Sequence, residues 1–195
     1  LGETPAVVRE CAAQFKNYSG WHKDTTALER GGQTFHKEEG YLMMGLIYYL
    51  QDNDPKLGGG LDVEPGSQKK PDRYAHAKQK PQPKASFLDR LLGRDKKQDN
   101  RQYGYDIADI ENCYTIPSKA GDLILFDYKI DHRATPKGDD NQEKMAVMAS
   151  FARDNKYLAE YHNYIGHRAD YHYLKDFSIP TEFADQARQA GLKLV

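Results

Sequence analysis

The alternation of apolar and polar residues along the chain predicts a series of short strands. Residues 41–50 (YLMMGLIYYL) are apolar on both faces of an extended chain, which predicts a central buried strand. Residues 61–64 alternate like a half-buried strand, and residues 113–117 and 122–128 predict two strands around a Lys-Ala-Gly turn. Residues 144–151 (KMAVMASF) predict one more. Short strands separated by Gly and Pro turns favour an all-β core with flanking helices, arranged as a sandwich or jelly roll.

Helical composition is concentrated towards the two ends of the chain. Residues 5–16 predict a helix, with Pro5 suited to its first turn. The segment 153–195 is predicted to be helical in pieces, and residues 180–190 form one of these pieces, with Gly191 as the C-terminal cap.

Residues 161–173 form an aromatic and polar run whose role the pattern leaves open. Amphipathic aromatic side chains commonly cover the edge of a sheet or an oligomer interface. The wall of a substrate pocket is the third role that fits this run.

Composition narrows the class of protein. At 195 residues we expect one domain, and a formal net charge of −1 implies no general attraction to nucleic acid or membrane. No run of 18 apolar residues and no signal peptide is visible. Cys11 and Cys113 are too few for a disulfide framework, so we expect a reduced, cytoplasmic compartment. The chain begins with Leu1 rather than Met, which leaves open whether residues precede it.

Residues 68–102 differ from the rest of the chain in charge. They carry 11 Lys or Arg against 4 Asp, and three prolines, which predicts a basic, Pro-rich insertion. Residues 86–94 could form a short amphipathic helix inside it. The insertion fits a solvated surface segment, or a lid that receives an anionic or polar substrate.

His22, Asp24 and His132 are the candidate metal ligands. His22 and Asp24 are two residues apart, so in a strand both side chains point to the same face. His132 follows the predicted strand at 122–128 by a few residues, and distant strands of a jelly roll can lie side by side. Two imidazoles and one carboxylate are the ligands of non-heme Fe(II) oxygenases and leave the opposite face of the metal open. The spacing of His22 and Asp24 does not by itself distinguish a metal site from a His and an Asp that are simply neighbours on the protein surface.

Lys144 opens the predicted strand at 144–151, 12 residues after His132. A cation at this place could hold the distal carboxylate of a dicarboxylic co-substrate. An ordinary lysine at the end of a strand is the alternative, and Arg133 or Arg153 would be next in line for the role.

The order of these segments resembles the phytanoyl-CoA dioxygenase family of Fe(II)/2-oxoglutarate-dependent oxygenases. The match covers roughly residues 20–152, with the basic insertion as an interruption. Five segments carry the resemblance, in chain order: 21–24 (WHKD), 41–50, 59–67 (GGLDVEPGS), 116–126 (IPSKAGDLILF) before His132, and 144–152. Each segment is weakly specific alone, and five in order are quite specific.

The resemblance implies a double-stranded β-helix, a cupin-like jelly roll, with iron bound inside one mouth. His22, Asp24 and His132 match the family's metal ligands, and Lys144 matches a position where the family usually carries Arg. The implied cofactors are Fe(II) and 2-oxoglutarate, with ascorbate as a stimulant. The implied reaction oxidises a C–H bond of a small molecule, usually to an alcohol, while 2-oxoglutarate and O2 give succinate and CO2. Because Asp24 is a carboxylate, the site differs from the halogenases of this fold.

Two other classes of protein remain compatible with the sequence. One is a non-catalytic jelly roll that binds a ligand. The other is a different metalloenzyme, such as a cupin-type isomerase or a zinc hydrolase, because two histidines and a carboxylate also suit Zn²⁺. We expect no side-chain general base beyond the ligands, no nucleic-acid partner and no membrane association. The oligomeric state stays open.

Overall fold

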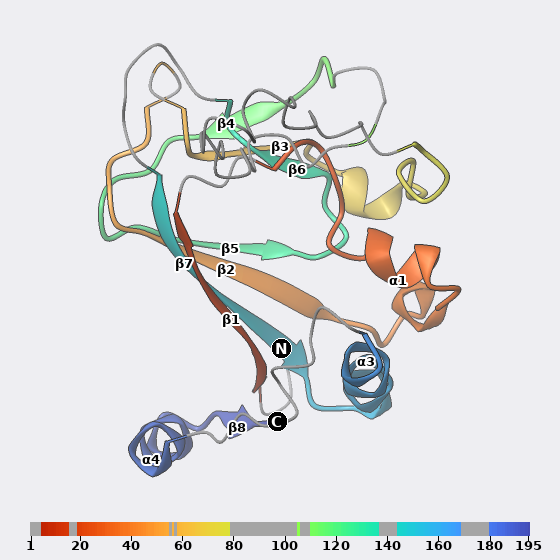
Figure 1. Cartoon of the computed structure of the whole chain (residues 1–195), viewed down its shortest axis with the longest axis vertical. Coiled ribbons are helices and arrows are strands. Elements are labelled where there is room, and N and C mark those ends of the chain that lie inside the picture. The colour runs from red at the N-terminus through yellow and green to blue at the C-terminus, as the bar shows by residue number, and fades with distance from the viewer. Residues whose placement is uncertain are drawn as a thin grey trace, which may run out of the picture.

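The computed structural model describes residues 5–15, 19–54, 56, 58–78, 105, 110–136, 144–168 and 180–195, and among these the strands form two sheets (Figure 1). The larger sheet has the order β5 (Leu123–Asp127), β2 (Met43–Tyr49), β7 (Met145–Arg153), β1 (Pro5–Phe15) and β8 (Lys193–Leu194). The smaller has the order β4 (Tyr114–Ile116), β3 (Leu61–Val63) and β6 (His132–Ala134). Neighbours are antiparallel except β1 and β8. The strands predicted from residue 41 onwards are therefore confirmed.

The two sheets face each other across an apolar core. Ile47 and Tyr49 of β2 and Phe126 of β5 pack with Leu61 and Val63 of β3. Burying an apolar side chain of this size contributes about 1.5–3 kcal/mol. This core joins the sheets into the predicted jelly roll, an all-β core flanked by helices.

β3 is buried on both faces, so the prediction of a half-buried strand at 61–64 was wrong. The polar residue within it, Asp62, is only 2% exposed. Its carboxylate accepts hydrogen bonds from Thr115 Oγ1 at 2.8 Å, Thr135 Oγ1 at 2.7 Å and Arg133 Nε at 2.8 Å. A carboxylate can be buried when its oxygens are paired in this way, which the alternation of apolar and polar residues does not reveal.

β2 lies in the interior of the larger sheet, between β5 and β7. Gly45 stands opposite Phe126 in the register, and a Cβ at this glycine would lie 2.6 Å from the Phe126 ring. The missing side chain therefore lets the Phe126 ring lie across the strand. That ring in turn contacts His132, with the ring centroids 4.7 Å apart.

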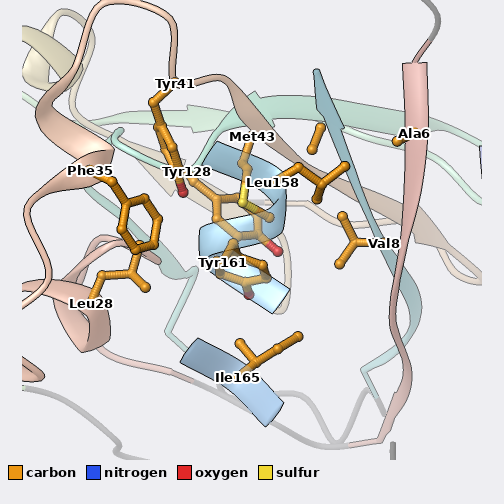
Figure 2. Close-up of a cluster of buried hydrophobic side chains, with 11 residues drawn as sticks. Ala6, Val8, Leu28, Phe35, Tyr41, Met43, Tyr128, Leu158, Tyr161 and Ile165 are labelled. Carbon is orange, nitrogen blue, oxygen red and sulfur yellow. The ribbon is translucent and has the colours of Figure 1, made fainter. Parts of the chain in front are cut away.

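A second apolar cluster lies where helices meet the larger sheet (Figure 2). Leu158, Tyr161 and Ile165 of α3 (Lys156–Gly166) converge on Met43 of β2 and on Leu28 of α1 (Thr26–Arg30). The short 3-10 helix η1 (Phe35–Lys37) adds an aromatic ring to the cluster. Because α1 begins two residues after Asp24, this packing holds in place the turn that carries the carboxylate.

The predicted helix at residues 5–16 was wrong, because this segment forms the strand β1. Ala6 and Val7 are paired on both sides, with β7 and with β8, and Ala6 and Val8 are fully buried. A shift in register between Val8 and Ala12 accommodates the irregular middle of the strand. Pairing within the sheet and burial outweigh a helical composition, since the propensity of single residues is worth less than 1 kcal/mol each.

The helical pieces predicted near the C-terminus are confirmed. The side chain of Asn155 caps α3 by accepting a hydrogen bond from Tyr157 N at 3.0 Å. α4 (Thr181–Gln189) begins after Pro180, and Gly191 follows its end with φ of 71°. The short strand β8 after this helix was not predicted.

The start of the basic insertion is part of the folded structure. The 3-10 helix η2 (Ser67–Lys69) begins it, and Lys70 and Arg73 both pair with Glu64. From residue 79 onwards the insertion, including the helix predicted at 86–94, lies outside the described residues. None of the helices in the described ranges is long and apolar enough to cross a membrane.

The outer face of the larger sheet is apolar and exposed. Tyr48 of β2 lies between Leu123 of β5 and Val147 of β7 in the register. These three side chains, together with Leu125 and Met145, are 38–55% exposed. An antiparallel sheet with one face in water usually carries polar residues on that face. The apolar composition of this face is instead typical of a sheet face that is buried.

Candidate metal centre

The three predicted ligands come together in space. One ligating atom from each of His22, Asp24 and His132 lies within 4.8 Å of the other two. Asp24 Oδ1 is 3.5 Å from His22 Nε2 and 3.7 Å from His132 Nε2. Residues 110 positions apart in the chain thus present two imidazoles and a carboxylate at one point.

An antiparallel bridge between the two histidine backbones creates this juxtaposition. His22 N donates to His132 O, and His132 N donates to His22 O, both at 3.0 Å. Asp24 N donates to Tyr128 O at 3.0 Å, which fixes the next turn of the chain. The predicted strand at His22 is therefore a single bridge, and Asp24 lies in the turn that leads to α1.

Hydrogen bonds select which nitrogen of each imidazole faces the site. Nδ1 of His22 lies 2.7 Å from Gly20 O, and Nδ1 of His132 lies 3.1 Å from Ile130 O. A carbonyl oxygen only accepts, so each Nδ1 carries a proton, and each Nε2 is the ring nitrogen that faces Asp24 and can ligate a metal. Two such imidazoles with one carboxylate fit Fe(II), and this arrangement supports the prediction of a metal site.

Burial and mutual attraction set the protonation of these groups. Burial, together with a smaller effect of the charge on His22, lowers the pKa of His132 to about 4. Burial also disfavours the charged forms of His22 and Asp24, but their hydrogen bond and charges outweigh it. The pKa of His22 is therefore raised and that of Asp24 is lowered. An anionic carboxylate next to a neutral imidazole is the form that binds a metal ion.

Lys144 immediately precedes β7 and is buried, with 6% of its surface exposed. A Cβ on Gly59 would touch its side chain at 3.5 Å, so the glycine-rich turn runs close to it. Burial lowers the pKa of Lys144 to about 8, and its charge contributes to lowering the pKa of His132. The lysine therefore acts electrostatically on the metal site.

Arg133 and Arg153, the alternatives to Lys144 as partner of the co-substrate, are placed differently. Arg133 Nε is bonded to the buried Asp62 at 2.8 Å, and its guanidinium lies 4.7 Å from the centre of the Trp21 ring. Arg153 ends β7, at the opposite end of the strand from Lys144. Of the three, Lys144 remains the candidate for an anionic co-substrate.

A cavity of about 230 Å³ opens beside His22 and Asp24. Aromatic rings and the C-terminal part of α3 form much of its wall: Tyr105, Tyr128, Tyr161, Tyr164, Ile165 and Arg168. Within the described part of the aromatic run, Tyr161 and Ile165 are core residues that also line this cavity.

Two further charged residues beside the ligands were missed in the sequence. Lys23 lies between His22 and Asp24 and is 3% exposed, and Asp131 precedes His132 and is 0% exposed. The position of Lys23 between two predicted ligands could have indicated that it is buried. When alternate residues of an extended chain face a metal, the residue between them points to the other side, here into the protein.

Comparison with known proteins identifies the family. The sequence profile of the phytanoyl-CoA dioxygenase (PhyH) family matches residues 11–143. No curated protein matches the chain significantly by sequence.

Comparison with solved structures finds similar chains. EvdO2 from Micromonospora carbonacea var. aurantiaca has a TM-score of 0.51 and 16% identity, over 77% of this chain and 52% of that chain. The epimerase SnoN from nogalamycin biosynthesis, described as non-heme and alpha-ketoglutarate-dependent, gives 0.47 and 13%, over 78% and 50%. EctD from S. alaskensis gives 0.45 and 16%, over 78% and 46%. The chain thus spans about half the length of these structures.

The family profile covers more than half of the chain and includes all three ligand positions. The likeness to EvdO2 independently supports the jelly-roll fold. The chain therefore belongs to the phytanoyl-CoA dioxygenase family.

Proposed function

We propose that this protein is an Fe(II)/2-oxoglutarate-dependent dioxygenase that hydroxylates a C–H bond of a small molecule. The observation that carries the proposal is the convergence of His22, Asp24 and His132, with both Nε2 atoms facing the same carboxylate. These residues would hold Fe(II) on one side and leave the other side for 2-oxoglutarate and O2. When bound, this group supplies the oxidising chemistry, in which 2-oxoglutarate and O2 become succinate and CO2.

Lys144 is the proposed partner of the distal carboxylate of 2-oxoglutarate. Its ammonium group is buried, and a pKa of about 8 leaves it charged at neutral pH. An ion pair in a buried place is stronger than at the surface, because water screens it less. Lysine offers a point charge where the family's arginine offers a two-pronged contact, so orientation depends more on the pocket walls.

The cavity beside the ligands is the proposed substrate site. Its volume of about 230 Å³ limits the part of the substrate that enters to a small group. Tyrosine rings and Ile165 provide flat, apolar contacts, while Arg168 provides a positive charge near the ring of Tyr164. We therefore favour a small organic acid with an apolar or ring-shaped body.

The reaction is tested with the purified chain, Fe(II), 2-oxoglutarate, O2 and ascorbate. We expect succinate to form even without the substrate, at a slow uncoupled rate, and this rate to depend on Fe(II). If succinate does not form and 2-oxoglutarate does not bind in the presence of metal, the oxygenase proposal is wrong. That result would favour the non-catalytic ligand-binding alternative. Turnover with Zn²⁺ but not Fe(II) would instead favour a hydrolase.

A further inference from the structure

Lys23, which lies between His22 and Asp24 in the chain, has its ammonium group enclosed in a buried cage of oxygen atoms. Lys23 Nζ donates to three backbone carbonyls, Ser67 O at 2.6 Å, Lys129 O at 2.8 Å and Lys70 O at 3.1 Å. It also lies 3.2 Å from Asp131 Oδ1. The ammonium group is therefore surrounded by oxygen atoms.

The oxygens of the cage come from two segments that surround the metal site. Ser67 and Lys70 belong to the turn around η2, whereas Lys129 and Asp131 lie in the loop between β5 and β6. That loop leads directly to His132. One ammonium group thus connects the turn that carries two ligands with the loop that positions the third.

Asp131 extends this connection. Its N–H donates to the hydroxyl of Ser67 at 2.7 Å, and its other carboxylate oxygen lies 3.0 Å from Arg73 Nη2. Ser67 is also 0% exposed. Asp131 therefore joins the η2 turn to the strand of His132 through both its backbone and its side chain.

Stability alone is a poor explanation for this pair. Removing a lysine and an aspartate from water is costly, and apolar residues of similar volume often give equal or greater stability. Buried charged groups with fixed partners do, however, hold a single geometry, because any displacement leaves a charge unpaired. Both members of this pair are chain neighbours of metal ligands, where such a constraint has a use.

We propose that Lys23 and Asp131 are positioning residues that preorganise the metal site. They hold the His22–Asp24 turn against His132, so that the three ligating atoms are close together before the metal binds. The Lys23 ammonium and the Asp131 carboxylate contact each other and neighbouring backbone, so the pair acts through the backbone that carries the ligands. The inference rests on the proposed function only in taking His22, Asp24 and His132 as the metal ligands.

The test compares metal affinity with stability in two single variants. Lys23→Met keeps the length of the side chain without its charge, and Asp131→Asn keeps the shape of the carboxylate. Binding of Fe(II) alone is measured anaerobically by calorimetry, well below the melting temperature of each metal-free protein. We expect both variants to bind Fe(II) roughly 10–100-fold more weakly, as for other groups that orient metal ligands.

Val7→Ala is the matched control. This substitution removes part of a buried side chain of β1 that belongs to neither apolar cluster and to none of the cage. We expect a lower melting temperature and an Fe(II) affinity within about twofold of the wild type, since metal contacts are unchanged. Equal loss of affinity in this control would mean that general destabilisation explains the effect, and would overturn the proposal.

A double variant separates positioning from folding. Lys23→Met with Asp131→Leu replaces the ion pair by apolar groups, and we expect it to recover melting temperature relative to the single variants. Its Fe(II) affinity should stay low. If affinity recovers together with stability, or if folded Lys23→Met binds Fe(II) like the wild type, the positioning role is refuted. Wild-type protein that binds Fe(II) but makes no succinate would refute the proposed function and leave this comparison intact.

Discussion

At the scale of single residues, each ligand of the candidate metal site is oriented by a neighbour that is itself fixed. The imidazoles of His22 and His132 are turned by backbone carbonyls two residues before them, at 2.7 and 3.1 Å. Short local contacts of this kind cost little chain entropy, because the partners are already close in sequence. The orientation of each imidazole is therefore a local matter, whereas long-range contacts such as the bridge between the two histidines bring the ligands together.

Removing the imidazole of His132 should abolish metal binding. In His132→Ala only one imidazole and one carboxylate remain, and the open side of the site becomes larger. We expect no measurable Fe(II) binding by calorimetry and no succinate. His76→Ala, at an exposed histidine, is the control and should retain both. Retained Fe(II)-dependent turnover in the first variant would place the metal elsewhere.

Replacement of Lys144 should affect 2-oxoglutarate rather than iron. An interaction with a charged group contributes about 1.5–3 kcal/mol, so Lys144→Ala should raise the 2-oxoglutarate requirement by roughly 10–100-fold while Fe(II) stays bound. Titrations of 2-oxoglutarate with the iron-loaded protein measure this. An unchanged affinity would mean that another cation pairs with the co-substrate.

The same lysine predicts a dependence on pH. With a pKa of about 8, its ammonium is charged below this pH and loses its proton above it. We expect 2-oxoglutarate binding to weaken as the pH rises through about 8. Lys144→Arg should keep its affinity up to pH 9, because a guanidinium stays charged. Parallel loss in both proteins would trace the effect to another group.

His36 should make stability sensitive to mild acid. It is 4% exposed and burial lowers its pKa, although Glu29 opposes this with a hydrogen bond at 3.4 Å. The unfolded chain therefore binds the proton more readily, so this contribution to stability is complete above about pH 6.5 and falls as the pH decreases below it. Urea unfolding at pH 5.5 and 7 should show a smaller pH effect in His36→Phe than in the wild type. The exposed His167→Gln should behave like the wild type.

At the scale of elements, α3 has two functions. Its inner side closes the second apolar cluster, and its C-terminal end forms a wall of the cavity beside Asp24. The sequence predicted helical pieces here but could not separate the roles of the aromatic run, because tyrosine suits a core edge and a ligand site equally well. For β1, in contrast, the sequence led to the wrong secondary structure. Its helical composition was misleading because sheet pairing, which involves residues about 140 positions away, decided its structure.

The end of α3 provides a test of the proposed substrate class. Arg168→Ala should leave uncoupled succinate formation unchanged, since that reaction needs no substrate and Arg168 is not one of the three proposed ligands. Small aromatic or aliphatic acids should accelerate succinate formation by the wild type and have little effect on the variant. Arg188→Ala, whose arginine pairs with Asp185 on α4 and is 75% exposed, is the matched control. Acceleration by neutral amides as well as acids would contradict the anionic assignment.

At the scale of the whole molecule, the jelly roll was predictable from its short strands. Which faces of its sheets are buried and which are exposed was not predictable. The apolar character of residues 41–50 on both faces predicted a strand buried on both sides, yet Tyr48 is 39% exposed. The convergence of His22, Asp24 and His132 was predictable because their spacing, order and chemistry agreed. The Lys23–Asp131 pair was not, since a lysine and an aspartate are usually exposed and only the fold brings them together.

The exposed face of the larger sheet should make the isolated chain self-associate. Its side chains are large and apolar, and β5 lies at the edge of the sheet, where unpaired backbone groups favour further pairing. We expect the apparent mass in light scattering to rise with protein concentration. Leu125→Lys with Val147→Lys should reduce this rise without changing Fe(II) affinity. A concentration-independent mass for the wild type would show that the face is tolerated in water.

The bridge between His22 and His132 also constrains how the protein acquires its metal. It closes a loop of about 110 residues, and forming a contact over such a length is entropically costly and slow, so it comes after more local structure has formed. We therefore expect the third ligand to meet the first two late in folding, and iron to bind a largely folded chain rather than to nucleate it. A nascent chain that ends before residue 132 lacks one of the three ligands.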